Sequence, residues 1–362
     1  MGREQMDPLA SLHLGFAGLP GTPADHLSVD GMTESGPNLS HWPGNRTPPR
    51  WKRDLSTGIC LAFARAEPAA QRAFLGGVTT VLNDHYDTDG FGSLLALLRP
   101  RVAFAREELL LAAAATGDFG RFVTARAFAI DRIIARLAEP ASPIAAEFAG
   151  LDGAHKSHRR YRWLLEHADE VLDRSDSFAP LYELELQQVR GELDAVLGGD
   201  AAERALDPAL GLAHVRSTRP LHRMTLNTVA GAFRVLHSMP QGKGALHRYH
   251  DRTESWFELV TFRAPPRRDL RPLARRLDAL EPGRDGARWC ADPPTEPIPE
   301  LYFGVPSAQA YGAITRELRP SALSADAVWR QVTGFFAAPA PAPTVAPSRR
   351  TPVQPDAGGG TA

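Results

Sequence analysis

Apolar residues in the amino-terminal part of the chain fall into short runs separated by polar and glycine-rich stretches. Three of these runs predict strands: residues 26–30, 38–41 and 77–83. The third run is rich in β-branched residues and predicts the central strand of a small sheet. Between the second and third runs, Leu55, Ile59 and Phe63 recur at helical spacing, which predicts a helix over residues 54–66.

The middle of the chain has the spacing of amphipathic helices. Helices are predicted in five segments: residues 101–116, 121–138, 144–148, 157–173 and 179–197. We expect Gly117 to end the first of these helices as a C-cap, and Pro140 and Pro143 to separate the second from the third. The Gly-Gly-Asp segment at residues 198–200 predicts a loop that closes the helical block.

From Gly211 onward the pattern changes to short alternating runs. Four of them predict strands: residues 212–216, 232–238, 245–250 and 255–262. Turn residues at 240–244 predict an antiparallel hairpin, and helices are predicted over residues 270–280 and 324–336. This order predicts an α/β amino-terminal half with a small central sheet and a helical block, followed by an α+β carboxyl-terminal half with antiparallel hairpins.

The same pattern divides the chain into four segments. They are an irregular leader at residues 1–25, an α/β domain with the helical block at 26–200, an α+β domain at 211–336 and a tail at 337–362. The tail is dominated by Pro, Ala and Gly. We expect it to be disordered, because it cannot bury enough apolar surface to offset its ordering entropy.

Composition narrows the class of protein. The chain has 362 residues and is 43% hydrophobic, which is ample for a core. Its formal net charge is −1, and this lack of a basic excess argues against a dedicated nucleic-acid binder. Its two cysteines, Cys60 and Cys290, do not form a disulfide framework. With no apolar run of membrane-spanning length and no signal-peptide pattern at the start, we expect a cytoplasmic protein.

The most chemically suggestive stretch is residues 85–93, His-Tyr-Asp-Thr-Asp-Gly-Phe-Gly-Ser, directly after the predicted central strand. If the strand pattern continues, His85, Asp87 and Asp89 point to one side, because strand side chains alternate. One imidazole and two carboxylates are ligands that suit Mn²⁺ or Mg²⁺. A helix that begins after Gly90 would offer its amides, and Ser93 its hydroxyl, to an anionic group.

This stretch has two other interpretations. A calcium loop of the EF-hand type is excluded, because the twelfth position would be Ala96 where that loop needs Glu. A polar turn between strand and helix, in which the aspartates cap and no metal binds, stays open.

Asp118 and His41 are the candidates for further ligands. Asp118 follows a predicted helix and is either a metal ligand or the N-cap of the next helix. His41 ends a predicted strand, and it approaches His85 and Asp87 if that strand neighbours the central one; otherwise it is a packed surface histidine. His155, His158, His247 and Glu254 have no assigned role.

Residues 85–93 resemble the first motif of the DHH phosphoesterase superfamily, His-x-Asp-x-Asp-Gly-x-x-Ser. That superfamily includes single-strand exonucleases, phosphodiesterases of small oligonucleotides and cyclic dinucleotides, and manganese-dependent pyrophosphatases. The resemblance implies a DHH-like domain at residues 26–200, two Mn²⁺ ions held by the motif, and Asp118 as the isolated acid of a second motif. The chain has no Asp-His-His triplet; the nearest segment, Ser-His-Trp-Pro at residues 40–43, precedes the first motif.

Across most of its length the chain resembles an uncharacterised family of proteins from high-GC bacteria that has no assigned activity. The matching landmarks are residues 39–44 (Leu-Ser-His-Trp-Pro-Gly), 85–90, 117–120 (Gly-Asp-Phe-Gly) and 254–256 (Glu-Ser-Trp). This resemblance implies an architecture more than a reaction.

These observations predict a Mn²⁺- or Mg²⁺-dependent hydrolase of a phosphoester or phosphoanhydride. The predicted metal ligands are His85, Asp87, Asp89, Asp118 and His41, and the predicted substrate contacts are Gly90 and Ser93. The expected substrate is a phosphorylated small molecule or a short oligonucleotide, with no membrane partner. The alternative is a degenerate DHH-like binding or interaction protein without catalysis, which the missing triplet favours. The motifs of serine hydrolases, P-loop kinases and zinc proteases are absent from the sequence.

Overall fold

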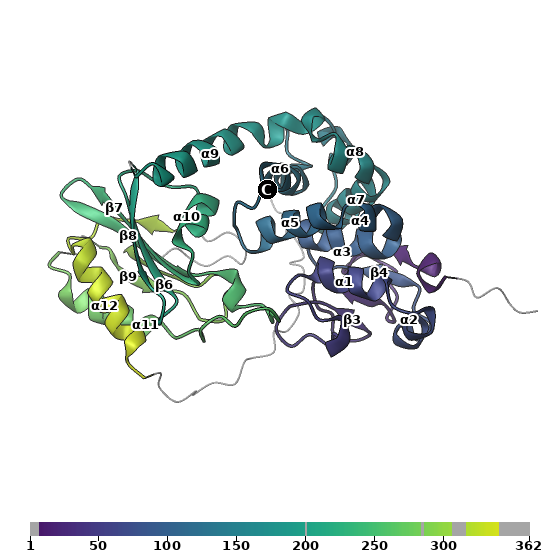
Figure 1. Cartoon of the computed structure of the whole chain (residues 1–362), viewed down its shortest axis with the longest axis horizontal. Coiled ribbons are helices and arrows are strands. Elements are labelled where there is room, and N and C mark those ends of the chain that lie inside the picture. The colour runs from purple at the N-terminus through teal and green to yellow at the C-terminus, as the bar shows by residue number, and fades with distance from the viewer. Residues whose placement is uncertain (1–6, 200, 284–285, 306–315, 340–362) are drawn as a thin grey trace, which may run out of the picture.

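The chain forms two halves that lie side by side in the computed structural model (Figure 1), which describes residues 7–199, 201–283, 286–305 and 316–339. The amino-terminal half, purple through blue to teal, is an α/β unit with a small parallel sheet. The carboxyl-terminal half, green to yellow, is built on a mixed, mostly antiparallel sheet with hairpins. The predicted fold class is therefore confirmed.

The amino-terminal sheet has four short parallel strands in the order β1-β4-β2-β3. Their bounds are β1 (His13–Leu14), β2 (Leu27–Val29), β3 (Asn38–Leu39) and β4 (Thr80–Leu82). The strand predicted over residues 77–83 is interior, as expected, since β4 lies between β1 and β2. The chain runs from β2 to β3 and then returns to β4 on the other side of β2, so the strand order reverses between β2 and β4. Open α/β sheets commonly bind ligands at such a point, beyond the carboxyl ends of the strands.

Helices cover this sheet and extend it into a helical block. The α-helices are α1 (Ser56–Ala64), α2 (Pro68–Leu75), α3 (Thr88–Leu98), α4 (Pro100–Ala105), α5 (Glu107–Asp118), α6 (Ala125–Arg136), α7 (Gly153–Glu166), α8 (Ala168–Asp173) and α9 (Glu183–Leu197). Short 3₁₀ turns are η1 (Pro8–Ser11), η2 (Pro49–Trp51), η3 (Ala145–Phe148) and η4 (Ser175–Leu181). Helix α1 packs against α3, and Ile59, Phe63 and Leu94 from these two helices are buried in the same apolar core.

The carboxyl-terminal sheet has the order β11-β10-β8-β7-β6-β5, with β9 paired to β10. Its strands are β5 (Ala202–Asp207), β6 (Leu212–Ser217), β7 (Arg234–Gln241), β8 (Gly244–Asp251), β9 (Arg288–Ala291), β10 (Glu300–Val305) and β11 (Glu317–Leu318). Helices α11 (Arg271–Leu280) and α12 (Ala325–Ala337) share an apolar core with one face of the sheet, and α10 (Arg223–Ala230) packs on the other. The hairpin of β7 and β8 forms where residues 240–244 predicted a turn.

Several elements differ from the sequence prediction. The leader predicted as irregular contains η1 and β1. Strand β1 pairs with β4, and the leader buries Leu9, Leu12 and Phe16. The helix predicted over residues 101–116 is divided into α4 and α5, and α5 runs through Gly117 to end at Asp118. Helix α2 and strands β5, β9, β10 and β11 were not predicted.

The run at residues 255–262 was predicted as a strand and is not one. After the short turn η5 (Thr253–Ser255) it crosses to the amino-terminal half. The Glu258 amide donates to the His41 carbonyl oxygen at 2.8 Å, and the amides of Val260 and Thr261 donate to Asp54. We call residues 256–261 the strap. Its Phe257 and Leu259 pack on Leu55 and Phe119 of the other half. This packing gives the segment an alternating apolar pattern, and the pattern alone cannot distinguish it from a strand.

Within the described residues, no helix is both long and apolar enough to span a membrane. The predicted tail at residues 337–362 falls almost wholly outside the described part of the chain; of it, only the end of α12 and the two residues that follow are described.

Candidate metal centre

The motif at residues 85–93 lies where β4 ends and α3 begins. Strand β4 stops at Leu82, so the motif forms a turn and the first turn of a helix, and the alternation expected for a continuing strand does not apply. Asp87 is the N-cap of α3, and its Oδ1 accepts the Gly90 amide at 2.8 Å. Asp89 is inside the first helical turn and is fully buried. As a result Asp87 and Asp89 face different neighbours.

Asp30, which sequence reasoning did not select, occupies the equivalent place after β2. Its φ of 61° is left-handed, a conformation that costs an ordinary residue on the order of 1–3 kcal/mol. The surrounding backbone holds it there: its amide donates to Leu39 at 3.0 Å, and its carbonyl oxygen accepts the Ser40 hydroxyl. The turn directs the Asp30 carboxylate toward the end of β4.

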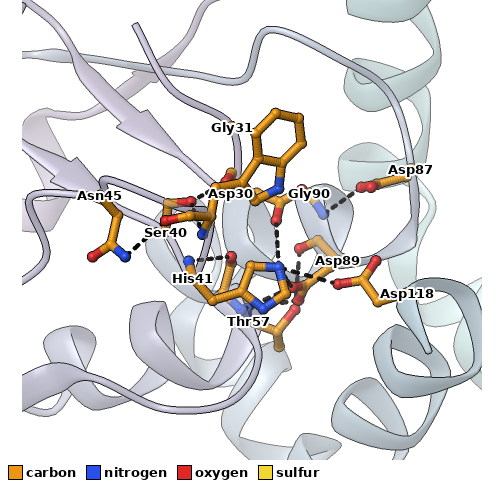
Figure 2. A network of polar contacts seen from close by, with 12 residues as sticks. Asp30, Gly31, Ser40, His41, Asn45, Thr57, Asp87, Asp89, Gly90 and Asp118 are labelled. Atoms are coloured by element: carbon orange, nitrogen blue, oxygen red, sulfur yellow. Dashed lines mark hydrogen bonds and ion pairs between the residues drawn. The ribbon is translucent and has the colours of Figure 1, made fainter. Parts of the chain in front are cut away.

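Four side chains from separate elements converge beyond the carboxyl ends of the strands (Figure 2): Asp30, His41, Asp89 and Asp118. We call them the buried cluster. His41 Nε2 is at the centre, 3.3 Å from Asp118 Oδ2, 3.7 Å from Asp89 Oδ2 and 3.8 Å from Asp30 Oδ1. The His41, Asp30 and Asp89 side chains are at most 1% exposed.

Hydrogen bonding does not account for the buried cluster. His41 Nδ1 lies 2.7 Å from the Asp54 carbonyl oxygen, which can only accept, so Nδ1 carries the proton and Nε2 presents a lone pair. His41 Nε2, Asp30 Oδ1 and Asp118 Oδ2 are buried atoms without a hydrogen-bond partner among the described residues. While the carboxylates are ionised, acceptors therefore face acceptors, and a cation would satisfy all of them together.

The spacing of these atoms fits a divalent cation. Two ligand atoms that each lie about 2.1 Å from an ion are separated by roughly 3.0 Å in octahedral and 3.4 Å in tetrahedral geometry. The distances of 3.3–3.8 Å around His41 Nε2 begin near the second value and exceed the octahedral one, so Mn²⁺ or Mg²⁺ would draw these atoms closer together. The strap supports the arrangement from the other half of the chain, because Phe257 stacks on the His41 ring with centroids 3.8 Å apart.

A second group, the open cluster, consists of Asp30, His85 and Asp87. His85 Nε2 lies 3.0 Å from both Asp30 Oδ2 and Asp87 Oδ2, and its Nδ1 lies 2.8 Å from Asp84 Oδ1. The side chains of His85 and Asp87 are 28% and 36% exposed, so solvent reaches this cluster and hardly reaches the other. Trp42 packs beside His85 with ring centroids 4.9 Å apart.

Asp30 joins the two clusters, because Oδ1 faces His41 and Oδ2 faces His85. This is the arrangement of a carboxylate shared by two neighbouring ions. Each imidazole also has the outer partner expected of a metal-bound histidine, the Asp54 carbonyl for His41 and the Asp84 carboxylate for His85.

Burial and mutual repulsion determine the protonation of these groups. Desolvation, followed by the charges of neighbouring aspartates, raises the pKa of Asp30 and of Asp118 well above the usual value. Burial lowers the pKa of His41. Burial alone would also lower the pKa of His85, but the Asp87 and Asp30 carboxylates outweigh it and raise that pKa well above 6.5. In the metal-free protein a proton on His85 thus supplies positive charge to the open cluster.

Asp89 has a structural role in addition to its place in the cluster. Its Oδ2 and Oδ1 accept the Ser56 and Thr57 amides at 2.8 and 2.7 Å, which caps the N-terminus of α1. The polar-turn interpretation expected the aspartates to cap the following helix, and Asp87 does so, whereas Asp89 caps a different one.

The two predicted substrate contacts serve packing in this structure. A methyl group at Gly90 would collide with the Asn83 amide and the Tyr161 hydroxyl, so glycine is required there, and its amide already donates to Asp87. The Ser93 side chain is fully buried and neighbours Cys60, away from any anion arriving from solvent. A hydroxyl one helical turn after a buried Asp89 points into the core, which the motif alone did not reveal.

The histidines and the glutamate left unassigned lie apart from both clusters. His155 pairs with Asp152 on the surface at 2.8 Å, His247 hydrogen-bonds Ser238 inside the carboxyl-terminal half, and Glu254 forms a buried ion pair with Arg252. His158 is half-buried on α7 and belongs to neither cluster.

Fold and site together define a two-part α/β and α+β protein with a paired His/Asp cluster at the switch point of its parallel sheet. The chain belongs to a family of unknown function, DUF6687, whose profile matches residues 14–346. Comparison with curated proteins and with solved structures found no match.

Replacing Asp89 with Asn is expected to destabilise the protein even without metal. Asn offers a single acceptor oxygen and would set its own amide against a helix amide, so we expect a loss of about 1–2 kcal/mol of unfolding free energy. Urea unfolding in the presence of a chelator measures this loss. Asp152→Asn, at the exposed N-cap of α7, is the control and should lose little. Equal stability of Asp89→Asn and wild type would contradict the capping role.

Divalent-ion binding is expected to release protons. In the metal-free protein, charged His85 stabilises the fold fully below pH 6.5, and that contribution disappears as pH rises through its raised folded pKa. An ion at the open cluster must displace this proton, so the apparent affinity for Mn²⁺ should increase with pH. Calorimetric titration in two buffers of different ionisation enthalpy counts the protons. His85→Gln should release fewer, and binding without proton release in the wild type would refute the assignment.

Proposed function

We propose that this protein is a divalent-metal-dependent hydrolase of phosphoesters or phosphoanhydrides, with Mn²⁺ or Mg²⁺ as its cofactor. The observation that carries the proposal is a set of three buried atoms without hydrogen-bond partners in the described structure: Asp30 Oδ1, His41 Nε2 and Asp118 Oδ2. The two carboxylate oxygens lie 3.8 and 3.3 Å from His41 Nε2. A protein interior rarely keeps such a set unless something that the polypeptide does not supply completes it.

The donor chemistry supports a hard or borderline cation. Carboxylate oxygens with one imidazole in each cluster suit Mn²⁺ or Mg²⁺, whereas no cysteine contributes. Asp30, His41, Asp89 and Asp118 would hold one ion, and Asp30, His85 and Asp87 a second. When bound, such a pair lowers the pKa of a coordinated water and offsets charge on phosphoryl oxygens.

The two clusters differ in what they can do. The buried cluster has four protein groups and almost no solvent exposure, so it is suited to hold an ion permanently. The open cluster has three groups and a solvent-facing side, which leaves room for a phosphoryl group. Trp42 packs beside His85 and Trp256 packs on Trp42, with ring centroids 4.9 Å apart in each pair, and the two rings would restrict the direction of approach.

The likeness of residues 85–93 to the first DHH motif supports the same reaction class. Asp118 would act as the second-motif acid, and His41 would replace a histidine of the missing triplet. The competing function is a binding protein that keeps the arrangement without catalysis. The observation in its favour is that Asp89 also caps α1, so this carboxylate has a structural role that needs no metal.

Asp118→Asn separates these functions. The Asp118 Oδ2 atom has no hydrogen-bond partner among the described residues, so the variant should be as stable as wild type, or more stable, when a chelator is present. Wild type should gain stability with millimolar Mn²⁺, and Asp118→Asn should lose that gain, because one ligand is missing. Thermal melts of both proteins with chelator and with Mn²⁺ measure this.

Asp194→Asn, at an exposed position of α9, is the matched control and should respond to Mn²⁺ like wild type. In parallel, Mn²⁺-dependent hydrolysis of a phosphodiester and of pyrophosphate should be present in wild type and fall to the uncatalysed rate in Asp118→Asn. Metal-dependent stabilisation without hydrolysis would favour the binding protein. An unchanged wild-type melt in Mn²⁺ would eliminate the metal centre itself.

A further inference from the structure

The carboxyl-terminal half holds the backbone of two ligands of the buried cluster. The Thr253 hydroxyl donates to the carbonyl oxygen of Asp118, and the Glu258 amide donates to the carbonyl oxygen of His41 at 2.8 Å. Residues 253–258 therefore connect two ligands that are far apart in the amino-terminal half of the sequence.

The Glu258 side chain holds the turn that follows His41. Its Oε1 accepts the Gly44 backbone amide at 2.8 Å, and its Oε2 accepts the Asn45 side-chain amide at 2.8 Å. The Lys52 ammonium donates to the same Oε2 at 2.9 Å. One carboxylate of the carboxyl-terminal half thus binds three donors of the amino-terminal half, and two of them belong to the turn that begins at His41.

The strap also fixes the ring of His41. Phe257 stacks on the imidazole with centroids 3.8 Å apart. The carbonyl oxygen of Asp54 accepts the His41 Nδ1 proton, and the Asp54 carboxylate accepts the amides of Val260 and Thr261 at 2.6 and 3.0 Å. The direction in which Nε2 points, toward the buried cluster, is therefore set by groups that the strap touches or holds.

The parallel sheet alone gives His41 less support. Strand β3, which ends two residues before His41, has two residues and lies at the edge of the sheet, so it pairs with a neighbour on one side only. A metal ligand must be held to within about 0.5 Å of its working position. His41 provides the imidazole of the buried cluster, so an error in its position weakens the whole ligand set.

We propose that Glu258 is a positioning residue for His41, and that the carboxyl-terminal half is thereby part of the metal centre. Glu258 does not contact the ion or the substrate; it acts by holding the turn at residues 41–45. The proposal rests on the metal centre of the proposed function and adds that its ion affinity is set from the other half of the chain. Because such coupling is reciprocal, a bound ion strengthens the attachment of the strap by the same factor.

Two substitutions at this position separate the reach of the side chain from its charge. Glu258→Asp keeps the charge but is one methylene shorter, so it cannot hold both amides of the turn. Glu258→Gln loses the charge but keeps an oxygen that reaches the Gly44 amide. If position matters, Glu258→Asp should bind its tightest Mn²⁺ ion about tenfold or more weakly than wild type, as is typical when the outer partner of a ligand is lost, and Glu258→Gln should lose clearly less.

The measurement is a Mn²⁺ titration of the metal-free, full-length protein, in which the electron paramagnetic resonance signal reports the free ion. Melts in chelator should show both variants folded like wild type. Glu147→Asp is the matched control, because Glu147 also pairs with a basic residue and its side chain is 45% exposed, against 41% for Glu258. It should bind Mn²⁺ like wild type.

Each outcome bears on a different claim. If Glu258→Asp binds Mn²⁺ as tightly as wild type, or if Glu258→Gln binds it more weakly than Glu258→Asp, Glu258 does not act by position and the proposal is wrong. Wild type that binds no Mn²⁺ would overturn the proposal together with the metal centre. Hydrolysis of a phosphodiester and of pyrophosphate is assayed on the same samples. Ion binding that depends on the reach of Glu258, without hydrolysis, would refute the proposed reaction and leave the positioning role standing.

Discussion

The repulsion among carboxylates that are kept out of water is the constraint on which the rest of the structure depends. Asp30, Asp89 and Asp118 meet around a neutral His41 in a space that solvent hardly enters. Burying negative charges together is unfavourable unless a cation or protons compensate them, and the raised pKa values of Asp30 and Asp118 reflect that cost. Asp30 extends the same constraint to the open cluster, where charged His85 compensates in the absence of metal.

Much of the architecture serves to hold these charges in place. Asp30, His41 and the motif at residues 85–89 follow three strands of one parallel sheet, whose carboxyl ends meet at a single edge. The amides of α1 hold Asp89 in place, and the strap brings Phe257 onto His41 from the other half of the chain. The two halves are therefore linked at the site.

Sequence patterns were informative where a local rule applied. The strands ending near Asp30 and His41, the helix after Leu55 and the hairpin around residues 240–244 follow from periodicity and turn residues, and the structure contains all of them. The sequence offered His41 and Asp118 as further ligands beside the motif. Whether His41 reaches the motif could not be predicted, because that depended on the order of the strands. In fact the His41 strand neighbours β2 rather than β4, and His41 still reaches the cluster.

The failures have physical causes. Asp30 was missed because Asp-Gly after a strand is an ordinary turn signal, and only the pairing of β2 with β4 reveals its importance. His85, Asp87 and Asp89 were predicted to point to one side of a continuing strand. The apolar run does not reveal that β4 ends at Leu82, before the motif begins. Residues 255–262 alternate like a strand because they pack on another half of the molecule, and periodicity cannot identify the surface that is covered.

Anomalous scattering from crystals grown with Mn²⁺ is the most direct test of the account. Data collected at the manganese edge should show one peak enclosed by Asp30, His41, Asp89 and Asp118, and a second between Asp30, His85 and Asp87, with the Asp30 carboxylate between them. The absence of a peak at the buried cluster, with water or a neighbouring side chain donating to His41 Nε2 instead, would contradict the claim that a divalent ion completes this site.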